Sequence, residues 1–444
     1  MSQEINLMYS VACGVSKGVI DKHFVYCLEE NVFYSYENAV WKTLHPIELL
    51  SLISDNPAYS YINNHSITIR KQIIENLKLL IKKRIEFFNK SGFLNFDIGE
   101  FDPLTLKMYD HKKENYSTFR IPYPYDFNAK CPLWEKTLLE IFEKDLDKVS
   151  ILQEFFGYCL TRDTRKEKAL LLLGESRTGK SSILYVLNNL IGESNCSNVA
   201  LKYISNPQYA PMLMNKLINI DTDVSGKAEK FEAEFKTITS GEPISVNQKY
   251  VPTFQFRPYC KLVMAANEFP HITDHSSAFY KRLILLPCNR VFEDMEQNLN
   301  LKDSLLEELP GIFNWTVEGL KRLNSRGYFE QKDFMKEAVQ ELREESNYVE
   351  IFFRNHINVK VADGVYIEKG ELYEIYKKWS QENGQNPLTA AKFSQAVFRK
   401  YSKVTPKNTH SKITGKRQWN NLVYIENKEI LETLSPQQDI AWQD

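Results

Sequence analysis

The sequence predicts an α/β fold, with a mixed helical region before the core and a smaller helical and stranded region after it. Residues 174–181 read Gly-Glu-Ser-Arg-Thr-Gly-Lys-Ser between an apolar run and a helical pattern. Short apolar strands alternate with helical patterns from about 167 to 295, which is typical of α/β cores. A chain of 444 residues with 43% apolar side chains is long enough for about two to four domains of ordinary core.

Before the core, we expect residues 1–92 to end in an amphipathic helix over about 67–90, closed by Gly92. Residues 93–132 predict short strands and turns, followed by a proline-spaced loop. Two helices are expected around 134–142 and 149–161. A charged link then leads into the strand that precedes the glycine-rich loop.

The loop at 174–181 matches the pattern Gly-x4-Gly-Lys-Ser. Its glycines let the backbone curl so that N–H groups point at phosphate, at the positive end of the following helix. Lys180 is expected to neutralise β/γ-phosphate oxygens, and the Ser181 hydroxyl to hold Mg²⁺. The sequence therefore predicts a site for ATP and Mg²⁺, formed by Gly174, Glu175, Ser176, Arg177, Thr178, Gly179, Lys180 and Ser181.

Two further strands end in polar side chains. Residues 216–223 form an apolar strand that ends in Asp221 and Asp223, about 40 residues after the loop. One acid is expected to hold Mg²⁺, with Asp221 assigned to the metal, and the other to orient or deprotonate the attacking water. A strand at 261–267 ends in Asn267. If it lies between the other two strands, Asn267 can bond both the γ-phosphate and that water.

Composition excludes several classes of protein. The formal net charge is −1, and no run approaches the roughly 18 apolar residues of a membrane span. The N-terminus lacks a basic region followed by an apolar one, so we expect a soluble, cytoplasmic protein. Seven scattered cysteines without Cys-x-x-Cys spacing favour reduced thiols over disulfides, and we expect no structural metal.

Taken together, these motifs resemble superfamily 3 helicases, in the branch of phage, plasmid and poxvirus primase–helicases. The set comprises the phosphate loop, the acid-ended strand, Lys-Thr-Ile-Thr-Ser-Gly-Glu at 236–242, Lys249-Tyr250, the strand ending at Asn267 with Pro270, and Phe-Tyr-Lys-Arg-Leu at 279–283. The segments 124–134 and 156–161 also resemble the domain that precedes the helicase in this branch. The resemblance covers residues 93–295 well, 296–430 loosely and 1–92 hardly at all.

The resemblance implies an AAA+-like ATPase that forms a ring, usually a hexamer, with ATP between subunits. Arg282 falls where this family places its arginine finger, and Lys281 and Arg290 are weaker candidates at the same interface. Lys249 and Tyr250 fall on the hairpin that the family projects into its channel. An ammonium and an aromatic face suit a grip on single-stranded DNA.

The chain departs from the family pattern in two places. Its acids are spaced Asp-Thr-Asp rather than adjacent, so the identity of the base stays open, although Asp223 is the better match. Many relatives carry a primase domain with paired carboxylates, for which residues 1–92 are too few. Asp97 and Asp102 lie in a sequence typical of a tight hairpin turn, so we expect a helicase without a primase.

Near the C-terminus, residues 392–417 contain eight cations and no acid. The order helix (372–383), helix (392–401) and ribbon (around 414–415) favours a winged-helix domain that binds duplex DNA. Arg399, Lys400, Lys416 and Arg417 are the candidate DNA contacts.

The predicted domains are an N-terminal region (1–92), a helicase-preceding domain (93–166), the P-loop core (167–295), a helical segment (296–357), the winged-helix domain (358–430) and a tail (431–444). The function we expect is an ATP-dependent DNA helicase for replication of a phage, plasmid or other mobile element, working with a separate primase or polymerase. Two alternatives stay open: an origin-binding initiator that uses ATP mainly for assembly, and a signalling P-loop ATPase. Because no Asn-Lys-x-Asp motif is present, a GTPase is disfavoured.

Overall fold

The computed structural model divides the chain into two units, residues 1–339 and 340–444. It describes residues 2–424 except 18–22, 225–230, 247–252, 268–276, 294, 296, 297, 299, 346–348, 350, 351, 354–358, 384–386, 402–407 and 411–416. Each unit has its own buried core, and the candidate site lies in the first.

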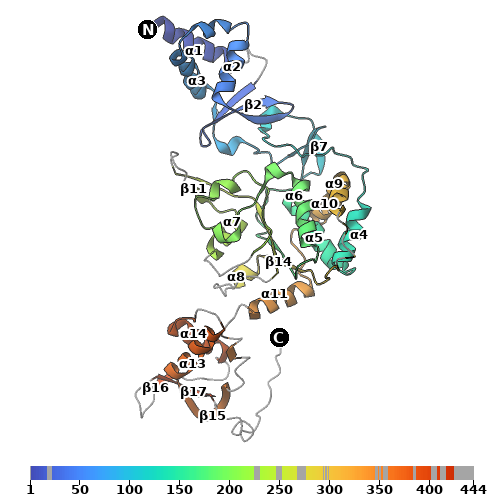
Figure 1. The fold of residues 1–444 in the computed structure, drawn as a ribbon, viewed down its shortest axis with the longest axis vertical. Coiled ribbons are helices and arrows are strands. Elements are labelled where there is room, and N and C mark those ends of the chain that lie inside the picture. The colour runs from blue at the N-terminus through green and yellow to red at the C-terminus, as the bar shows by residue number, and fades with distance from the viewer. Residues whose placement is uncertain are drawn as a thin grey trace. The chain divides into compact units, whose positions relative to one another are not determined.

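The first unit begins with helices packed on a four-stranded sheet of order β3-β2-β1-β4 (Figure 1). Its elements are α1 (Ser2–Ser16), β1 (His23–Cys27), β2 (Val32–Glu37), β3 (Val40–Leu44), α2 (Pro46–Asp55), η1 (Ser60–Asn64), α3 (Ile67–Leu80) and β4 (Lys82–Lys83). Alternate residues of a strand point to opposite faces, so Phe24 and Tyr26 pack on the helices. Val25 and Cys27 face the other way, toward Trp41 and Phe88.

The helix expected over 67–90 is shorter than the sequence predicted. α3 ends at Leu80, with Ile81 as its C-cap, and Lys82 and Lys83 then pair in parallel with Tyr26 and Cys27 of β1. The free edge of β1 offers backbone hydrogen bonds to residues 81–83, and this tertiary pairing overrides the local helical pattern. The short helix η2 (Ile85–Phe87) follows.

Residues 93–161 follow the predicted order of short strands and then two helices. The strands β5 (Leu94–Asn95), β6 (Glu100–Asp102) and β7 (Lys107–Tyr109) form an antiparallel sheet, followed by η3 (Lys113–Asn115). Asp97 lies in the β5–β6 hairpin, and the Asp102 carboxylate accepts from Leu104 N (2.9 Å) and Thr105 Oγ1 (2.7 Å). Asp97 therefore has the hairpin setting that the sequence predicted, whereas Asp102 ends strand β6 and its carboxylate caps the following β6–β7 turn. The helices α4 (Pro132–Ile141) and α5 (Leu146–Cys159) come next.

The core of the first unit is a five-stranded sheet of order β14-β8-β13-β10-β9 whose paired strands are all parallel. This sheet confirms the α/β class. Its strands are β8 (Ala169–Leu173), β9 (Cys196–Ser197), β10 (Ile218–Asp221), β13 (Lys261–Ala266) and β14 (Leu283–Pro287). β13 lies between β8 and β10, the position that the Asn267 prediction required.

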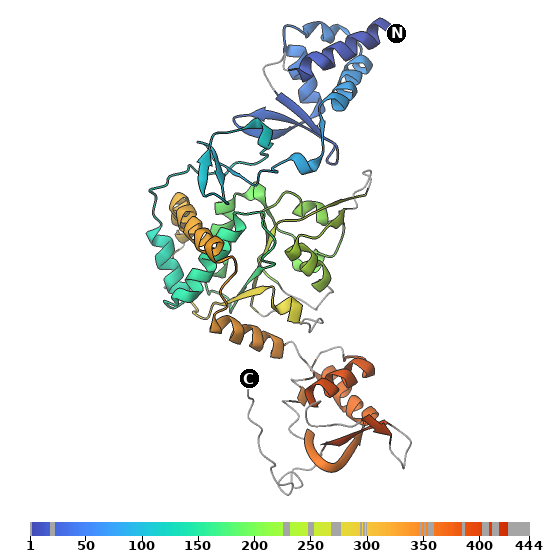
Figure 2. The ribbon, with the colours of Figure 1, turned by 180° about the vertical axis from the view of Figure 1, so that it is seen from behind.

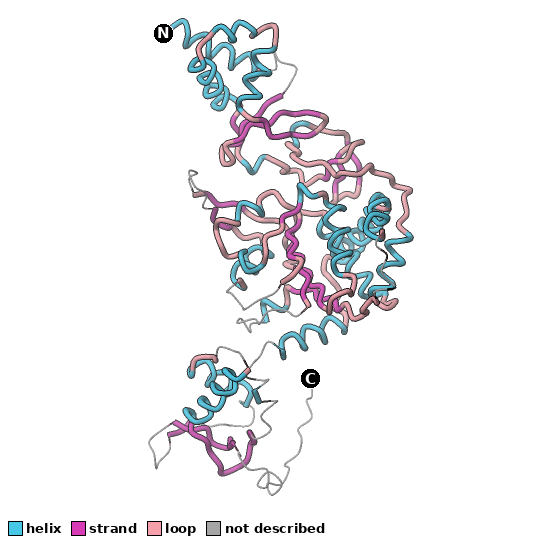
Figure 3. The backbone as a smooth tube through the Cα atoms, viewed as in Figure 1, coloured by secondary structure: helices cyan, strands magenta, loops and turns pink. Residues whose placement is uncertain are grey.

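Helices cover both faces of this sheet, as Figures 2 and 3 show. One face buries Leu170, Leu172 and Val263 against α4, α5, α6 and α10. α7 lies on the other face (Figure 1). The remaining elements around the sheet are η4 (Glu193–Asn195), η5 (Leu201–Tyr203), η6 (Ala210–Leu213), α6 (Lys180–Ile191), α7 (Glu232–Ser240), β11 (Ile244–Val246), β12 (Phe254–Phe256), α8 (Ser277–Tyr280), α9 (Leu301–Glu307) and α10 (Leu309–Arg326).

The helices α5 and α10 pack at unusually close range. A Cβ atom on Gly157 would lie 2.5 Å from Leu320 N, and one on Gly319 would lie 2.2 Å from Gln153 O. Beside this contact Glu154 is buried and pairs with Arg322 (2.7 Å) and Arg326. Two small residues and one buried ion cluster therefore fix the helix pair that supports the sheet.

The second unit contains the helix–helix–ribbon order that the sequence predicted. Its elements are β15 (Val359–Glu368), α13 (Lys369–Glu382), α14 (Ala390–Tyr401), β16 (Asn408–His410) and β17 (Arg417–Tyr424), with sheet order β15-β17-β16. Leu372, Tyr376, Phe393 and Trp419 form its core. α11 (Asp333–Glu345) spans the boundary between the units.

Candidate functional site

The loop at 174–181 joins the carboxyl end of β8 to the first residue of α6. At Gly174 a Cβ atom would lie 2.1 Å from the Cys288 carbonyl oxygen, so no side chain fits. Gly179 has φ +87°. A Cβ atom on Gly179 would lie 2.5 Å from the Ile141 side chain of α4. A left-handed conformation and close neighbours thus explain both glycines of the motif.

Lys180 folds back across this loop. Its Nζ donates to the carbonyl oxygens of Gly174 and Glu175, both at 2.6 Å, and to Thr178 Oγ1 at 3.1 Å. The side chain is 8% exposed, and burial lowers the pKa of its ammonium group. Glu175, Ser176, Arg177 and Ser181 are exposed around it. The loop therefore holds a buried cation at the N-terminus of a 12-residue helix.

The two acids after β10 have different surroundings. Asp221 is half-buried, and its Oδ2 accepts from Leu201 N at 2.7 Å. Asp223 is exposed. The next residue, Val224, donates its N–H to Ala265 O at 2.9 Å, so the chain stays alongside β13 as far as Asp223. One carboxylate oxygen of Asp221 is therefore used in a hydrogen bond to the backbone of Leu201, whereas the Asp223 carboxylate faces solvent.

Asn267 links the third strand to the loop. It directly follows β13, and its Nδ2 donates to Ser176 Oγ at 3.4 Å. Because β8, β13 and β10 are neighbouring parallel strands, their carboxyl ends lie at one edge of the sheet. The structure thus brings together the loop, Asp221, Asp223 and Asn267 at that edge.

Arg282 lies at the opposite edge. Its carbonyl oxygen accepts from Ala169 N (2.8 Å), beside the first residue of β8, whereas the loop starts after the last. At about 3.3 Å per residue, the chain from Ala169 to the first residue of the loop, Gly174, spans about 16 Å. The Arg282 guanidinium donates to Ser240 Oγ (3.1 Å) and pairs with Glu167 (2.7 Å). Arg282 is therefore remote from the loop of its own chain.

A cavity of about 320 Å³ surrounds this arginine, lined by Arg165, Lys166, Glu167, Ala278, Lys281 and Arg282. Four of these six residues are cationic. Asp163 neutralises part of this charge by accepting from Arg165 and Lys166. Arg290, in contrast, follows β14 on the loop's side of the sheet and stacks on Phe292 with 4.4 Å to the ring centroid. Phe292 N donates to Arg177 O at 2.9 Å, which places this segment beside the loop.

The predicted DNA contacts fall mainly outside the described residues. Lys249 and Tyr250 lie in the undescribed connection between the paired strands β11 and β12. Arg399 and Lys400 belong to α14, and β17 begins at Arg417, but their side chains are outside the described part, as is all of Lys416. These assignments stay predictions.

Sequence reasoning missed Asn219. Its Oδ1 accepts from Ser197 Oγ and Val199 N, both at 2.9 Å, and its Nδ2 donates to Val199 O. Together with Asp221 it holds the 197–201 segment against β10. The available signal was a polar residue inside an apolar strand, two positions before an acid.

Comparisons with known proteins match two parts of the chain to family models. Residues 19–143 match a model described as D5 N terminal like, and residues 172–282 match a family of unknown function, DUF5906. The first match starts at residue 19, well before residue 93, where the sequence resemblance was expected to become strong.

Two curated relatives match over larger stretches. A DNA primase-polymerase of Nitratiruptor phage NrS-1 is 21% identical over 207 residues, which are 45% of this chain and 28% of that protein. A putative helicase of Acanthamoeba polyphaga mimivirus is 22% identical over 443 residues, covering 83% of this chain and 45% of that protein. The chain therefore spans less than half the length of either relative.

Solved structures of the NrS-1 C-terminal region share the fold. One apo structure has a TM-score of 0.54 at 18% identity, covering 94% of this chain and 98% of that one. Its A form has a TM-score of 0.52 at 17% identity, covering 93% and 98%. Among the described residues, no helix is both long and apolar enough to cross a bilayer.

Proposed function

We propose that this chain is an ATP-dependent DNA helicase that acts in replication of a phage, plasmid or other mobile element. The observation that carries the proposal is the meeting of the 174–181 loop, Asp221, Asp223 and Asn267 at the carboxyl edge of one parallel sheet. Matches to the D5 N-terminal-like model and to proteins named helicase and primase-polymerase support it.

In this proposal the loop binds the phosphates of ATP. Backbone N–H groups at the start of α6 face the anion, and Lys180 exchanges the carbonyl oxygens of Gly174 and Glu175 for β/γ-phosphate oxygens. Ser181 and Asp221 would hold Mg²⁺, which neutralises charge on the phosphates when bound. Asp221 Oδ2 accepts from Leu201 N at 2.7 Å, and its Oδ1 accepts from Asp223 N at the longer distance of 3.4 Å, so Oδ1 is the oxygen that would turn to the metal.

Asp223 is the better candidate for the general base. It is exposed beside the end of β13, and the structure gives its carboxylate no structural hydrogen bond among the described contacts. Asn267, one strand closer to the loop, orients the attacking water from its amide. A base and an orienting amide on adjacent strands suit in-line attack on the γ-phosphate.

Arg282 completes the site from a neighbouring subunit in this proposal. It lies about 16 Å along β8 from the loop of its own chain, too far to reach that loop's phosphates. In a ring, usually a hexamer in the family it resembles, one subunit's Arg282 edge faces the next subunit's loop edge. Lys281 and Arg165 share the cavity and add positive charge there.

DNA translocation is assigned to the connection between β11 and β12, which carries Lys249 and Tyr250. The α13, α14 and β16–β17 elements of the second unit are proposed to form the winged helix, with duplex DNA as its ligand. That second unit also favours the runner-up function, an origin-binding initiator in which ATP controls assembly.

The two functions differ in how DNA affects ATP hydrolysis. A helicase should hydrolyse ATP several-fold faster with oligo-dT, and Lys180→Ala should lose about 10²-fold or more of kcat. The measurement is steady-state ATPase activity with oligo-dT, with duplex and without DNA. If only sequence-specific duplex binding is found, and single strands leave hydrolysis unchanged, the initiator function replaces the helicase.

A further inference from the structure

One face of the N-terminal sheet carries exposed rings and cations that the ATPase site does not use. The segment 82–90 reads Lys-Lys-Arg-Ile-Glu-Phe-Phe-Asn-Lys, with four cations and one acid. It begins as the edge strand beside β1 and then packs Ile85 and Phe88 on the face of the sheet opposite the helices α1 and α3. We name the following residues the aromatic–cationic surface: His23, Lys83, Phe87, Lys90, Lys113 and Tyr116.

Strand pairing builds this surface. Lys83 is the parallel partner of Cys27, whose side chain packs with Trp41 on the face away from the helices. The N–H of Ile85 donates to Glu29 Oε2 at 2.8 Å, which fixes the start of η2. Phe88 then enters the core while Phe87 stays 39% exposed. An outward aromatic ring is thus held on the short helix η2, directly after the edge strand β4.

Two cations of this surface, Lys83 and Lys90, lie over aromatic rings. Lys83 Nζ is 5.4 Å from the Phe87 ring centroid and 5.8 Å from that of Tyr116. Lys90 Nζ is 5.7 Å from Phe87. Within the described residues, none of Lys83, Lys90 and Lys113 forms an ion pair with an acid. Their positive charge therefore remains available to an anionic ligand.

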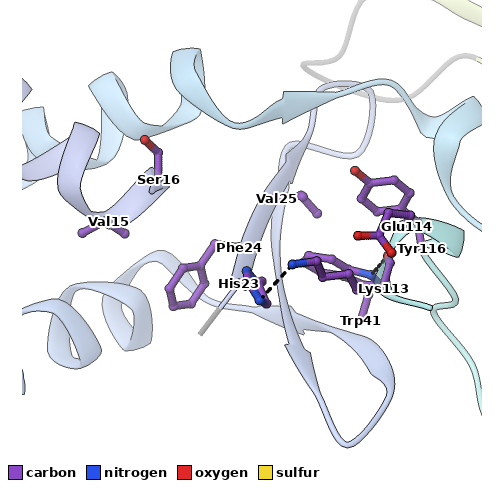
Figure 4. Close-up of a pocket in the computed structure, with 9 residues that line it drawn as sticks. All are labelled: Val15, Ser16, His23, Phe24, Val25, Trp41, Lys113, Glu114 and Tyr116. Carbon is purple, nitrogen blue, oxygen red and sulfur yellow. Dashed lines mark hydrogen bonds between the residues drawn. The ribbon is translucent and has the colours of Figure 1, made fainter. Parts of the chain in front are cut away.

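A cavity of about 170 Å³ adjoins the surface, and Figure 4 shows nine residues that line it. Trp41 and Tyr116 stack on each other at 5.4 Å between centroids, and both contribute to the lining. Trp41 Nε1 donates to Lys113 O (2.9 Å), while Lys113 Nζ lies 3.2 Å from His23 Nε2. The cavity is smaller than the roughly 300–1,000 Å³ of sites for drug-sized ligands, so it suits one planar ring system.

We propose that the aromatic–cationic surface binds single-stranded DNA. Exposed Phe87 provides a stacking face for a base, Lys83, Lys90 and Lys113 contact successive phosphates, and the cavity takes one base. An acidic peptide would use the cations but leave the ring and the cavity without a role. Paired bases in a duplex cannot enter the cavity. This proposal takes from the proposed function only that the ligand is DNA.

The test measures fluorescence anisotropy of labelled oligo-dT with the full chain, without nucleotide, over a series of salt concentrations. Phe87→Ala should weaken binding about five-fold or more, because stacking on an aromatic ring contributes strongly per base. Lys83→Gln should lower the slope of log Kd against log salt by about 0.7, the value for one phosphate contact on a single strand. Lys42→Gln is the matched control.

Lys42 is exposed on β3 next to Trp41, so its side chain points to the opposite face of the same sheet. Lys42→Gln removes one positive charge from the same sheet, as Lys83→Gln does. Its slope of log Kd against log salt should equal that of the wild type. If Lys83→Gln and Lys42→Gln give the same slope, or if duplex competes as well as oligo-dT, the proposal is overturned.

Photocrosslinking of the unsubstituted chain gives a second measurement that does not depend on how the variants fold. Oligo-dT carrying 5-iodouracil should crosslink to Phe87, Trp41 or Tyr116, identified by mass spectrometry. Crosslinks confined to other segments would contradict the proposal. Neither experiment contains nucleotide, so both test DNA binding even if the chain does not hydrolyse ATP. Failure of the helicase proposal can therefore be told apart from failure of the DNA-binding proposal.

Discussion

Two carboxylates separated by one residue differ in what they can do, because their surroundings differ. Asp221 accepts a backbone hydrogen bond from Leu201 N at 2.7 Å, and Asp223 faces solvent beside β13. A carboxylate that already holds the backbone is a poor choice for a proton acceptor, since moving to reach water would leave an N–H unpaired. This contrast supports the proposal that Asp223 is the general base.

Asp223→Asn should therefore lower kcat for ATP hydrolysis by about 10²–10⁴-fold, because an amide cannot accept the proton of the attacking water. ATP binding should persist, measured by fluorescence of a labelled nucleotide analogue. Asp221→Asn is the matched variant: its amide oxygen still accepts from Leu201 N, so the fold is retained. Because Asp221 is proposed to hold Mg²⁺, Asp221→Asn should raise the Mg²⁺ concentration needed for half-maximal hydrolysis, whereas Asp223→Asn should leave it unchanged. Recovery of hydrolysis by Asp223→Asn, but not by Asp221→Asn, at high Mg²⁺ would reverse the assignment.

Lys261 is a buried cation outside the proposed chemistry. It begins β13, is 2% exposed, and donates its Nζ to Thr161 O (2.7 Å) and Tyr259 O (2.9 Å). Burial lowers the pKa of this lysine from its ordinary 10.5 to about 8. Its hydrogen bonds to two carbonyl oxygens connect the end of α5 to the sheet. Burying the ammonium group away from water destabilises its charged form.

This pKa predicts how stability changes with pH. Between pH 8 and about 10.5 the unfolded chain keeps the Lys261 proton while the folded chain loses it, so the lysine's contribution to stability rises with pH. The free energy of unfolding of the wild type minus that of Lys261→Met should increase across this window, by up to about 3 kcal/mol. Urea denaturation at several pH values measures this difference in unfolding free energy. A difference that stays constant or falls as the pH rises would contradict a lowered pKa for Lys261.

At the scale of elements, the α5–α10 contact supports the sheet that carries the site. Gly157 and Gly319 allow the two backbones to approach until a Cβ atom on either would overlap the other helix. The pair also buries Glu154 with two arginines. Small residues and a satisfied charge cluster make this packing specific to one register.

Gly157→Ala should destabilise the first unit by about 1–3 kcal/mol, because the added methyl overlaps Leu320 and forces the helices apart. Gly370→Ala is the control, since nothing lies within 4 Å of a Cβ atom there and alanine favours the helix by about 0.5–1 kcal/mol. Calorimetry of the full chain follows both transitions. Equal stability of Gly157→Ala and the wild type would show that the helices adjust without cost.

The sequence predicted the elements whose pattern is local. The loop at 174–181, the strand before it and the helix after it each follow from adjacent residues. The position of β13 between β8 and β10 meets the condition on which the Asn267 prediction depended. The end of α3 was not predictable, because β4 forms only through pairing with β1, more than 50 residues earlier. Long-range backbone pairing leaves no periodic signal in the segment that responds to it.

Some side-chain contacts of the candidate site could likewise not be predicted from the sequence. Asn219 and Asp221 hold the 197–201 segment through side chains, a relation that depends on how that segment folds back. The pairing of Arg282 with Glu167 joins two strand starts that are far apart in sequence. Residue types indicated which groups were chemically useful, and only the fold showed which of them are already engaged.

At the scale of the whole molecule, the position of Arg282 requires more than one chain if it acts on ATP. It lies at the amino edge of the sheet and the loop at the carboxyl edge. Mixing Lys180→Ala chains with Arg282→Ala chains should therefore restore ATP hydrolysis, since an intact loop then meets an intact arginine at some interfaces. A mixture no more active than the sum of its parts would show that the arginine does not act between subunits.

In the proposed function, ATP hydrolysis at this site drives the separation of DNA strands. The most direct measurement is displacement of a labelled strand from forked DNA, on both fork polarities, by the wild type and by Lys180→Ala. The wild type should displace the strand on one fork polarity when ATP is present, and Lys180→Ala should displace none. Hydrolysis of ATP by the wild type without displacement on either fork would contradict the proposed function.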